Sequence, residues 1–321
     1  METRRGFIKN SAILCAAACL PFSCSVSRPA AAGGELKTRD PRRALVLCYS
    51  QTGLTGRYGK LIGCVLKGKG LETDFIDMQG FNLRRLADYD LIIVGTPVFY
   101  YDIPSNVSDW LSALPNIAGT PVAAFVSFGG PEGNQHNAVC HTLRLLSNAG
   151  GVPVGMDFFR SIPAYPTPKW DGPNQTSAEH LPNEATFDQV RRFANQVLER
   201  VGRGETIAYA EEFALREFLR ALPLVWLNKK AIGLHTVDGA KCIKCLTCVK
   251  KCPVAAIDPI GQVVNKGKCL ACFGCLNNCP AGAVVIEYRG ERLYGFREYL
   301  KRRELTIAEP PEFRNCSLEN I

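Results

Sequence analysis

Short apolar runs alternate along much of the chain with stretches of helical periodicity. Ala44 to Tyr49 is a continuous apolar run, typical of a parallel strand that is covered on both faces. Similar runs predict strands, and 3.6-residue patterns predict helices between them. Strands that alternate with helices predict a parallel α/β sheet with right-handed crossovers from Ala44 onward. The other predicted strands are 71–77, 91–96, 122–127 and 152–159, and the predicted helices are 54–67, 105–114, 137–149 and a stretch after Glu184.

The pattern changes after this region. Residues 203–235 form a connecting segment in which 211–230 predicts an apolar helix interrupted at Pro223. We expect this helix to pack between two domains, with membrane-surface contact as the weaker alternative. A short segment, 236–286, predicts a second domain, and 287–321 predicts a helix followed by a tail.

The first 32 residues predict an export signal. A basic start with paired Arg4 and Arg5 precedes an apolar core and the small residues Ala30 to Ala32. The paired arginines, followed by Phe7 and Lys9, resemble a twin-arginine signal. We therefore expect an exported protein on the periplasmic or extracytoplasmic side, with 33–43 as a linker. A lipid anchor at Cys19 or Cys24 is a minority alternative.

Composition narrows the class of partner. The 321 residues are 46% hydrophobic and 21% charged, which is ordinary for globular domains and excludes a disordered or fibrous chain. The formal charge of +8 falls to +5 without the first 32 residues, because four positive and one negative side chains lie there. This small residual charge argues against nucleic acid as a partner.

Eight of the 15 cysteines occupy a duplicated unit. A run spaced C-x2-C-x2-C-x3-C-P begins at Cys242 and recurs 27 residues later at Cys269. In bacterial two-cluster proteins, the first three cysteines of such a run bind one [4Fe-4S] cluster and the fourth binds the other. The predicted ligands are Cys242, Cys245, Cys248 and Cys279 for one cluster, and Cys269, Cys272, Cys275 and Cys252 for the second.

Disulfides and structural zinc are the two alternative uses of these cysteines. Disulfides suit an exported protein, but disulfide scaffolds usually have dispersed cysteines. Structural zinc needs two short hooks and has no use for the third and fourth cysteine of each run. The unit over 236–286 resembles a bacterial two-cluster ferredoxin, a small α+β domain that transfers single electrons. Six lysines against two aspartates give it either a solvated basic surface or a docking face for an acidic partner.

Three loops of the α/β region follow predicted strands. Ser50-Gln51-Thr52-Gly53-Leu54-Thr55 offers hydroxyls, a glycine and the free amides of a helix start, a combination that binds phosphate. Helix capping by Ser and Thr is the alternative. Thr96-Pro97-Val98-Phe99-Tyr100-Tyr101 and Ser127-Phe128-Gly129-Gly130 are expected at the same edge of the sheet, where ligands of open α/β sheets bind.

The three loops together resemble those of flavodoxin. The resemblance implies a flavodoxin-like, doubly wound parallel sheet over residues 44–202, with FMN phosphate in the first loop and the flavin ring between the second and third. Which of Phe99, Tyr100, Tyr101 and Phe128 stacks on the ring stays open, as does a flavodoxin-like domain without cofactor. A nicotinamide site is not expected, because Gly68-Lys69-Gly70 lacks the third glycine of the dinucleotide fingerprint. His136 and His141 are expected to be exposed or capping.

The whole arrangement resembles bacterial flavodoxin-ferredoxin fusion proteins. That resemblance implies an electron-transfer protein in which two [4Fe-4S] clusters exchange electrons with FMN. The expected partner is a redox protein or a membrane electron-transfer complex. Two alternatives stay open: a flavin-dependent reductase of a quinone or another small oxidised substrate, and a redox-sensing or assembly protein without FMN.

Overall fold

The computed structural model describes residues 34–130, 134–166, 176–212 and 222–318. The predicted export signal therefore lies outside the described residues. Within the ranges just given, no helix is both long and apolar enough to cross a bilayer.

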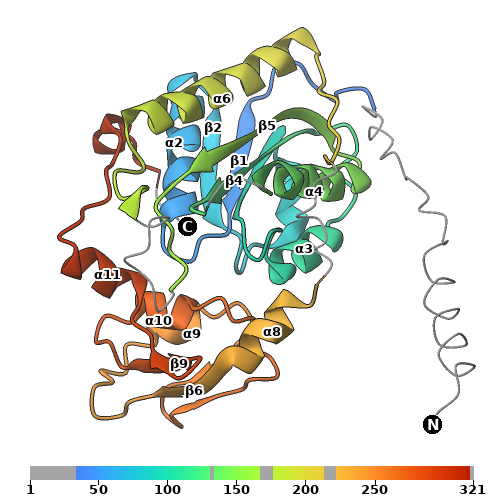
Figure 1. Ribbon diagram of the computed structural model, residues 1–321. Coiled ribbons are helices and arrows are strands. Elements are labelled where there is room, and N and C mark those ends of the chain that lie inside the picture. The colour runs from blue at the N-terminus through green and yellow to red at the C-terminus, as the bar shows by residue number, and fades with distance from the viewer. Residues whose placement is uncertain (1–33, 131–133, 167–175, 213–221, 319–321) are drawn as a thin grey trace, which may run out of the picture.

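The first domain is built on a parallel sheet of five strands (Figure 1). Their order is β2-β1-β3-β4-β5, which is the flavodoxin-like order of a doubly wound sheet. The α/β prediction is thus confirmed, and each strand lies within two residues of its predicted bounds. The strands are β1 (Arg43–Cys48), β2 (Glu72–Asp77), β3 (Leu91–Pro97), β4 (Pro121–Phe128) and β5 (Val152–Arg160).

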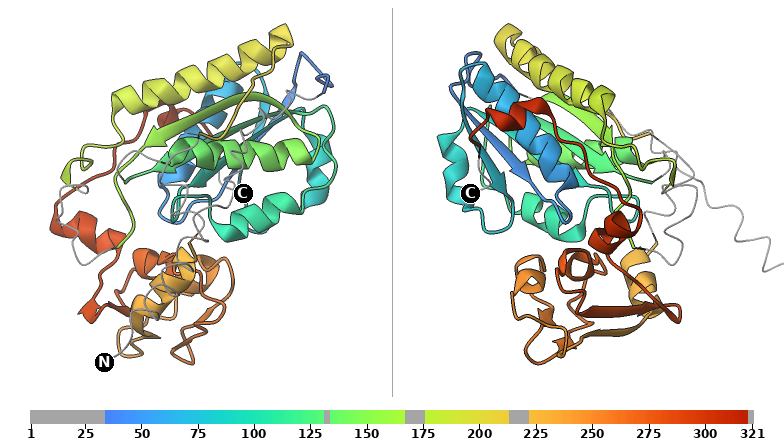
Figure 2. Two further views of the ribbon diagram at one scale, coloured as in Figure 1. Left: turned by 45° about the vertical axis from the view of Figure 1, so that its right-hand side comes forward. Right: turned by 90° about the vertical axis from the view of Figure 1, so that its left-hand side faces the viewer.

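Helices cover both faces of this sheet (Figure 2). Alternate residues of β1 show why, because Leu45 packs into one apolar core and Val46 into the other. The Leu45 core includes α3 (Ser105–Ser112) and α4 (Gln135–Asn148), and the Val46 core includes α2 and α6. The remaining bounds are α2 (Leu54–Gly68), α6 (Glu184–Arg203) and a short 3-10 helix η2 (Leu83–Asp88).

The second domain is small and mixed. An antiparallel sheet ordered β10-β9-β6 packs beside a two-stranded hairpin and two short helices, as expected for an α+β unit. Its core includes Ile286, Phe273 and Leu276, all nearly fully buried. The elements are β6 (Ile232–Val237), α9 (Thr247–Lys250), β7 (Ile257–Asp258), β8 (Val263–Val264), α10 (Gly274–Asn278), β9 (Val284–Tyr288) and β10 (Glu291–Arg292).

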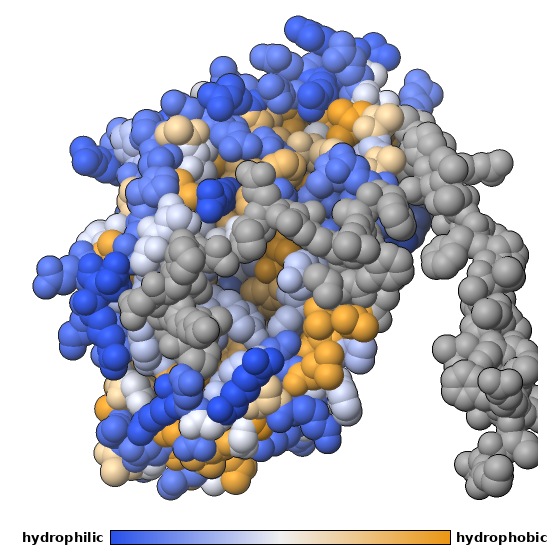
Figure 3. Space-filling view, viewed as in Figure 1, coloured by the Kyte–Doolittle hydropathy of each residue, from blue (hydrophilic) through white to orange (hydrophobic). Residues whose placement is uncertain are grey.

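The described part of the connecting helix is less buried than predicted. Helix α8 (Leu224–Ala231) follows Pro223 and buries none of its residues. Trp226 is 55% exposed, and Figure 3 shows apolar side chains gathered over α8. Asn228 is its link to the domains, because its Oδ1 accepts hydrogen bonds from the hydroxyls of Tyr165 (3.1 Å) and Tyr288 (2.7 Å). Helix α8 therefore contacts both domains through Asn228, as expected of a connecting helix, but Trp226 and Leu227 are exposed and its apolar face is not buried between the domains. Residues 213–221 lie outside the described residues.

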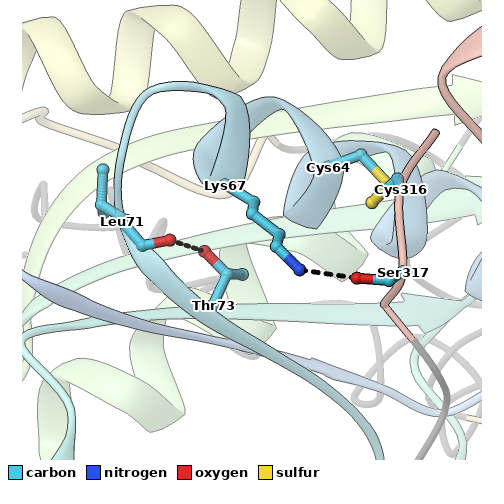
Figure 4. Close-up of a disulfide and its surroundings, with 6 residues drawn as sticks. All are labelled: Cys64, Lys67, Leu71, Thr73, Cys316 and Ser317. Atoms are coloured by element: carbon cyan, nitrogen blue, oxygen red, sulfur yellow. Dashed lines mark hydrogen bonds between the residues drawn. A yellow bond between two sulfur atoms is a disulfide. The ribbon is translucent and has the colours of Figure 1, made fainter.

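The C-terminal segment returns to the first domain. After α11 (Phe296–Arg302) and the 3-10 turn η3 (Pro311–Arg314), Cys316 forms a disulfide with Cys64 of α2, with the two Cα atoms 5.8 Å apart (Figure 4). Leu318 is buried in the core beneath α2. The expected tail is therefore fastened to the α/β domain, a contact that no local pattern could reveal. Cys48 and Cys140 remain buried thiols.

Candidate functional site

The eight clustered cysteines line two separate cavities in the small domain. Each cavity takes three cysteines from one run and the fourth from the other, which is the crossed grouping expected from the spacing. Cavity I is lined by Cys242, Cys245, Cys248 and Cys279, and cavity II is lined by Cys252, Cys269, Cys272 and Cys275.

The donor set fits iron-sulfur clusters. All eight cysteines are free thiols, so the disulfide alternative does not describe them. Among the described residues, no group of three or more cysteine, histidine or acidic side chains is arranged to hold a single metal ion. Four thiols drawn three from one run and one from the other match a [4Fe-4S] cluster, whereas structural zinc sites pair two short cysteine hooks.

The two runs repeat each other in backbone conformation as well as in sequence. Lys244 and Leu246 have left-handed φ angles of 56° and 58°, and their equivalents Ala271 and Phe273 have 52° and 56°. Left-handed backbone is costly for residues other than glycine. The left-handed residues at matched positions curl each run around its cavity, so that the cysteine side chains point inward.

Backbone amides already approach the sulfur atoms. The amides of Ala256 and Ala283, at equivalent places after each run, donate to Sγ of Cys252 (3.1 Å) and Cys279 (3.2 Å). Such N–H donors stabilise thiolates and raise the reduction potential of a cluster. This explains why the sequence repeat extends beyond the ligands to the alanines.

The two cavities differ in burial. Cys245 of cavity I is exposed, and hydrogen bonds from Thr247 lower the pKa of its thiol. In cavity II, burial raises the pKa of Cys272 to about 12, and burial with neighbouring thiols also raises the pKa of Cys275. Buried thiolates need cationic iron to compensate their charge. Cavity I therefore has one exposed cysteine, Cys245, and cavity II has none.

A histidine missed by sequence reasoning lies against cavity II. Nε2 of His235 is 3.5 Å from Sγ of Cys275, and the side chain lines the cavity. Burial, with the charge of Lys266, lowers the pKa of His235 to about 4, so the ring is neutral. His235 lies in β6, outside both cysteine runs, so no sequence pattern connected it with the cysteines.

The first loop has the geometry of an anion site. Gly53 is left-handed, with φ 84°, and directly precedes α2, whose start carries no side-chain cap. Oγ of Ser50 accepts from the amide of Gly56 (3.1 Å), which closes the turn. The remaining amides at the start of α2, beside Thr52, are available to a phosphate.

The second loop turns back on itself after β3. Backbone hydrogen bonds pair Phe99 with Asp102, and the residues between them, Tyr100 and Tyr101, are both left-handed. The hydroxyl of Tyr100 donates to the carbonyl oxygen of Ala271 at 2.7 Å, and Tyr101 is 40% exposed. Tyr100 thus points into the small domain. Thr96, at the start of this loop, is fully buried. Strand β3 ends at Pro97, and Val98 connects it to the turn.

The third loop is joined to the other two. Oγ of Ser127 lies 2.6 Å from Oγ1 of Thr55, and its carbonyl accepts from the amide of Val98 (3.0 Å). Phe128 packs edge-on against Phe158. Gly129 lies so close to the backbone of residue 163 that a side chain would collide with it, and Gly130 is exposed. The three predicted loops therefore meet at one edge of the sheet.

Buried polar atoms without partners gather at this edge. Oε1 of Gln51, Oδ1 of Asn106 and Oδ1 of Asn134 find no hydrogen-bond partner among the described residues. Such atoms are rare unless a ligand or water satisfies them. They come from the first loop and the starts of α3 and α4, so the edge fits a polar ligand such as FMN. Asn106 and Asn134 resemble ordinary helix starts in the sequence, so they were missed.

The small domain covers the same edge. The carbonyl of Gln51 accepts from Nδ2 of Asn278 (2.7 Å), and Nε2 of Gln51 donates to the carbonyl of Lys251 (3.3 Å). Nδ2 of Asn277 donates to the carbonyl of Ala164, beyond β5 (3.0 Å). Leu54 packs on Phe296 and Tyr299 near α11. Loops that follow β1, β3 and β5 thus all contact the cluster domain.

Cavity II is the nearer of the two to the loops. Ala271, which accepts from Tyr100, lies between Cys269 and Cys272 in the chain. Burial raises the pKa of Tyr100, and the charges of Tyr165 and Cys272 add to this rise. Cys272 likewise contributes to the raised pKa of Tyr49, which follows β1.

The histidines near the third loop are partly different from expectation. Nδ1 of His141 is 2.8 Å from Oδ1 of Asp102, and the histidine side chain is only 14% exposed. The ring therefore anchors the second loop to α4 and is neither exposed nor capping. The two residues are 39 positions apart, so local spacing could not pair them.

Comparisons with known proteins agree with this division. A family model described as 4Fe-4S dicluster domain matches residues 235–280. A NAD(P)H dehydrogenase (quinone) of Paracoccus denitrificans is 30% identical over 80 residues, which are 23% of this chain and 38% of that relative. This chain therefore aligns with less than half of the relative's length.

Two solved flavodoxins resemble the first domain. An archaeal flavodoxin is 21% identical, with a TM-score of 0.38, and covers 50% of this chain and 98% of its own. Oxidised Flavodoxin 2 of Bacillus cereus is 22% identical, with a TM-score of 0.40, and covers 49% and 99%. The flavodoxin-like assignment itself rests on the strand order. The chain thus joins a flavodoxin-like domain to a two-cluster ferredoxin domain, as the sequence predicted.

Proposed function

We propose that this protein is an exported iron-sulfur flavoprotein that relays single electrons between two [4Fe-4S] clusters and FMN. The observation that carries the proposal is the contact between the second cysteine run and the carboxyl-edge loops, seen in the bonds from Tyr100 to Ala271 and from Asn278 to Gln51. Ligands of doubly wound sheets bind at this edge. The cluster of cavity II would therefore lie next to the flavin.

Different residues would bind the FMN and the two clusters. FMN supplies chemistry that can take one or two electrons, whereas each cluster passes one. The first loop would hold the phosphate through Thr52 and the amides that start α2. The second and third loops would hold the ring, with Asn106 and Asn134 satisfying polar atoms on it. The eight cysteines named above would hold the clusters.

Protein groups around cavity II keep the electron path dry. Phe273 is 2% exposed and packs edge-on against Tyr165, whose ring packs in turn against Tyr100. Excluding water lowers the reorganisation that accompanies each charge movement and protects reduced groups from side reactions. These aromatic side chains thus seal the junction between cluster and flavin.

Two features of the chain support export after folding. The twin-arginine pattern at Arg4 and Arg5 suits a protein that is exported with its cofactors inserted. The disulfide between Cys64 and Cys316 suits an oxidising compartment, since such bonds are rare in reducing ones. The partner would then be a redox protein or a membrane complex at the extracytoplasmic face.

Cofactor content tests the proposal. Protein prepared anaerobically should contain about eight irons and one FMN per chain. On reduction with dithionite, EPR should detect reduced clusters, and flavin absorbance should bleach in the same sample. Iron without flavin would overturn the relay and favour the redox-sensing or assembly alternative.

A quinone reductase is the second candidate, favoured by the partial match to the Paracoccus denitrificans enzyme. The coverage of the carboxyl edge by the small domain favours the relay, because a bulky substrate would have to reach the ring past Tyr100 and Tyr165. Steady turnover of a soluble quinone with NAD(P)H as sole donor would support the reductase instead.

A further inference from the structure

The duplicated unit presents two equivalent surfaces, of which one is occupied. In the second run, Ala271 and Phe273 are nearly fully buried, and both lie at the contact with Tyr100 and Tyr165 of the α/β domain. The first run is displaced by 27 positions, so its equivalents are Lys244 and Leu246. Their matched left-handed φ angles show that the backbone is the same.

The equivalent surface of the first run is exposed and apolar. Leu246 is 44% exposed, and Ile243, which also lines cavity I, is 65% exposed. The neighbouring hairpin adds Ile260 at 62% and Val263 at 59%, and Pro259, beside Ile260, lines the same cavity. Large apolar side chains gathered around a cofactor site mark an interaction surface.

Charge distinguishes this surface from the internal contact. Ala271 and Asn277, which contact the α/β domain, are replaced in the first run by Lys244 and Lys250. Both lysines are exposed, and no acidic side chain among the described residues forms an ion pair with either. Lys250 lies two residues after Cys248, a cysteine of cavity I, in the same short helix α9. The surface therefore has an apolar centre beside cavity I and a positive rim.

A second copy of this chain fits the surface poorly. In the internal contact Gln51 packs on Gly274, where there is no room for a Cβ atom. The first run has Thr247 at that position, so the first loop of another copy would collide there. The occupant must have its own shape and an acidic surface.

We propose that Ile243, Leu246, Ile260 and Val263, rimmed by Lys244 and Lys250, form the docking surface for an acidic electron-transfer protein that exchanges electrons with the cluster of cavity I. The inference rests on the relay function and names its partner class. Cavity I is then the external port and cavity II the internal step to the flavin. One electron passes from the reduced partner, which is oxidised, to the cluster, which is reduced, and no bond is made or broken.

Stopped-flow kinetics on the anaerobic, fully loaded protein tests this surface. The probe is a reduced acidic bacterial flavodoxin, and the readout is the second-order rate constant for cluster reduction at several salt concentrations. The variant Lys244→Glu/Lys250→Glu should lower the rate about tenfold at low salt and flatten its salt dependence. Ile260→Ser should lower the rate without changing the salt dependence. Lys69→Glu, a single reversal at an exposed site after α2, should leave both unchanged.

Iron content and EPR after dithionite show that each variant retains its clusters. Equal rates for wild type and the double variant would overturn the proposal, as would an equal loss in Lys69→Glu. Two further results would also overturn it: wild type that sediments with anionic vesicles through these lysines while the flavodoxin rate is unaffected, or a dimer that the double variant abolishes. If the clusters accept electrons from the probe but flavin absorbance never bleaches, the relay has failed and the docking surface stands.

Discussion

The hydroxyl of Tyr100 donates a 2.7 Å hydrogen bond to the carbonyl oxygen of Ala271, although the two residues are 171 positions apart. Tyr100 belongs to the loop after β3, and Ala271 lies between two ligands of cavity II. The bond therefore connects the edge where a flavin would bind to the backbone that wraps a cluster. Such a direct contact sets the distance between the two redox centres within a single chain.

The crossed grouping of cysteines makes the first prediction. Cys252→Ser should remove the cluster of cavity II and leave the cluster held by its sequence neighbours in cavity I. Iron should fall from about eight to about four per chain, and EPR of the reduced variant should show one cluster. Flavin reduction through the clusters should then be lost. Cys279→Ser is the mirror control and should remove only the cluster of cavity I; loss of the neighbouring cluster in either variant would refute the crossed assignment.

The first loop makes the second prediction. Thr52→Ala should weaken FMN binding about tenfold or more, since a hydrogen bond to a charged phosphate contributes about 1.5 to 3 kcal/mol. Fluorescence titration of flavin-free protein measures the dissociation constant. Thr306→Ala, at an exposed position, is the control. An unchanged affinity in Thr52→Ala would remove this loop from the flavin site.

His235 makes the third prediction. His235→Leu removes the group 3.5 Å from Sγ of Cys275, so the reduced cluster of cavity II loses a donor. A bond of about 1 kcal/mol corresponds to a potential lower by roughly 40 mV for one electron. EPR-monitored redox titration should show this shift in one cluster, and His235→Gln should restore part of it. A shift of the same size in both clusters would point to a general loss of packing.

The disulfide makes the fourth prediction. Cys316→Ala should lower the free energy of unfolding of the α/β domain by about 2 to 4 kcal/mol, because the bond closes a long loop. Urea unfolding followed by circular dichroism measures the loss. Ser317→Ala removes only the exposed hydrogen bond from Lys67 and serves as the control. Identical midpoints for wild type and Cys316→Ala would show that the tail is held by packing alone.

The paired arginines make the fifth prediction. Replacing Arg4 and Arg5 with lysines keeps the charge but removes both guanidinium groups, which are not interchangeable with ammonium groups in recognition. The protein should then accumulate in the cytoplasm, as measured by cell fractionation. Continued export would discredit the twin-arginine interpretation while leaving the relay untouched.

The sequence predicted what depends on local pattern. Continuous apolar runs such as Ala44 to Tyr49 are typical of strands buried on both faces, and such strands predict a parallel sheet. The cysteine spacing was equally informative, because three thiols two residues apart can surround only one cluster. Both signals act within a few residues; the strands form the expected sheet, and the cysteines gather in two groups of four.

Other features depend on contacts between distant segments. Cys64 and Cys316 are separated by 252 positions, and either could have been an ordinary thiol. Asp102 and His141 pair across two elements, and the exposure of Trp226 depends on how α8 docks. None of these carries a periodic or spaced signal, so each required the folded chain.

The bond between Cys64 and Cys316 turns most of the polypeptide into a covalent ring that includes the whole cluster domain. A single protease cut anywhere between these two residues would therefore leave the pieces joined, and they would separate on a denaturing gel only after a reductant is added. The cluster domain is also attached at both of its ends, so it cannot swing away from the sheet on one tether. A partner must come to the protein, because the cluster domain cannot travel to the partner.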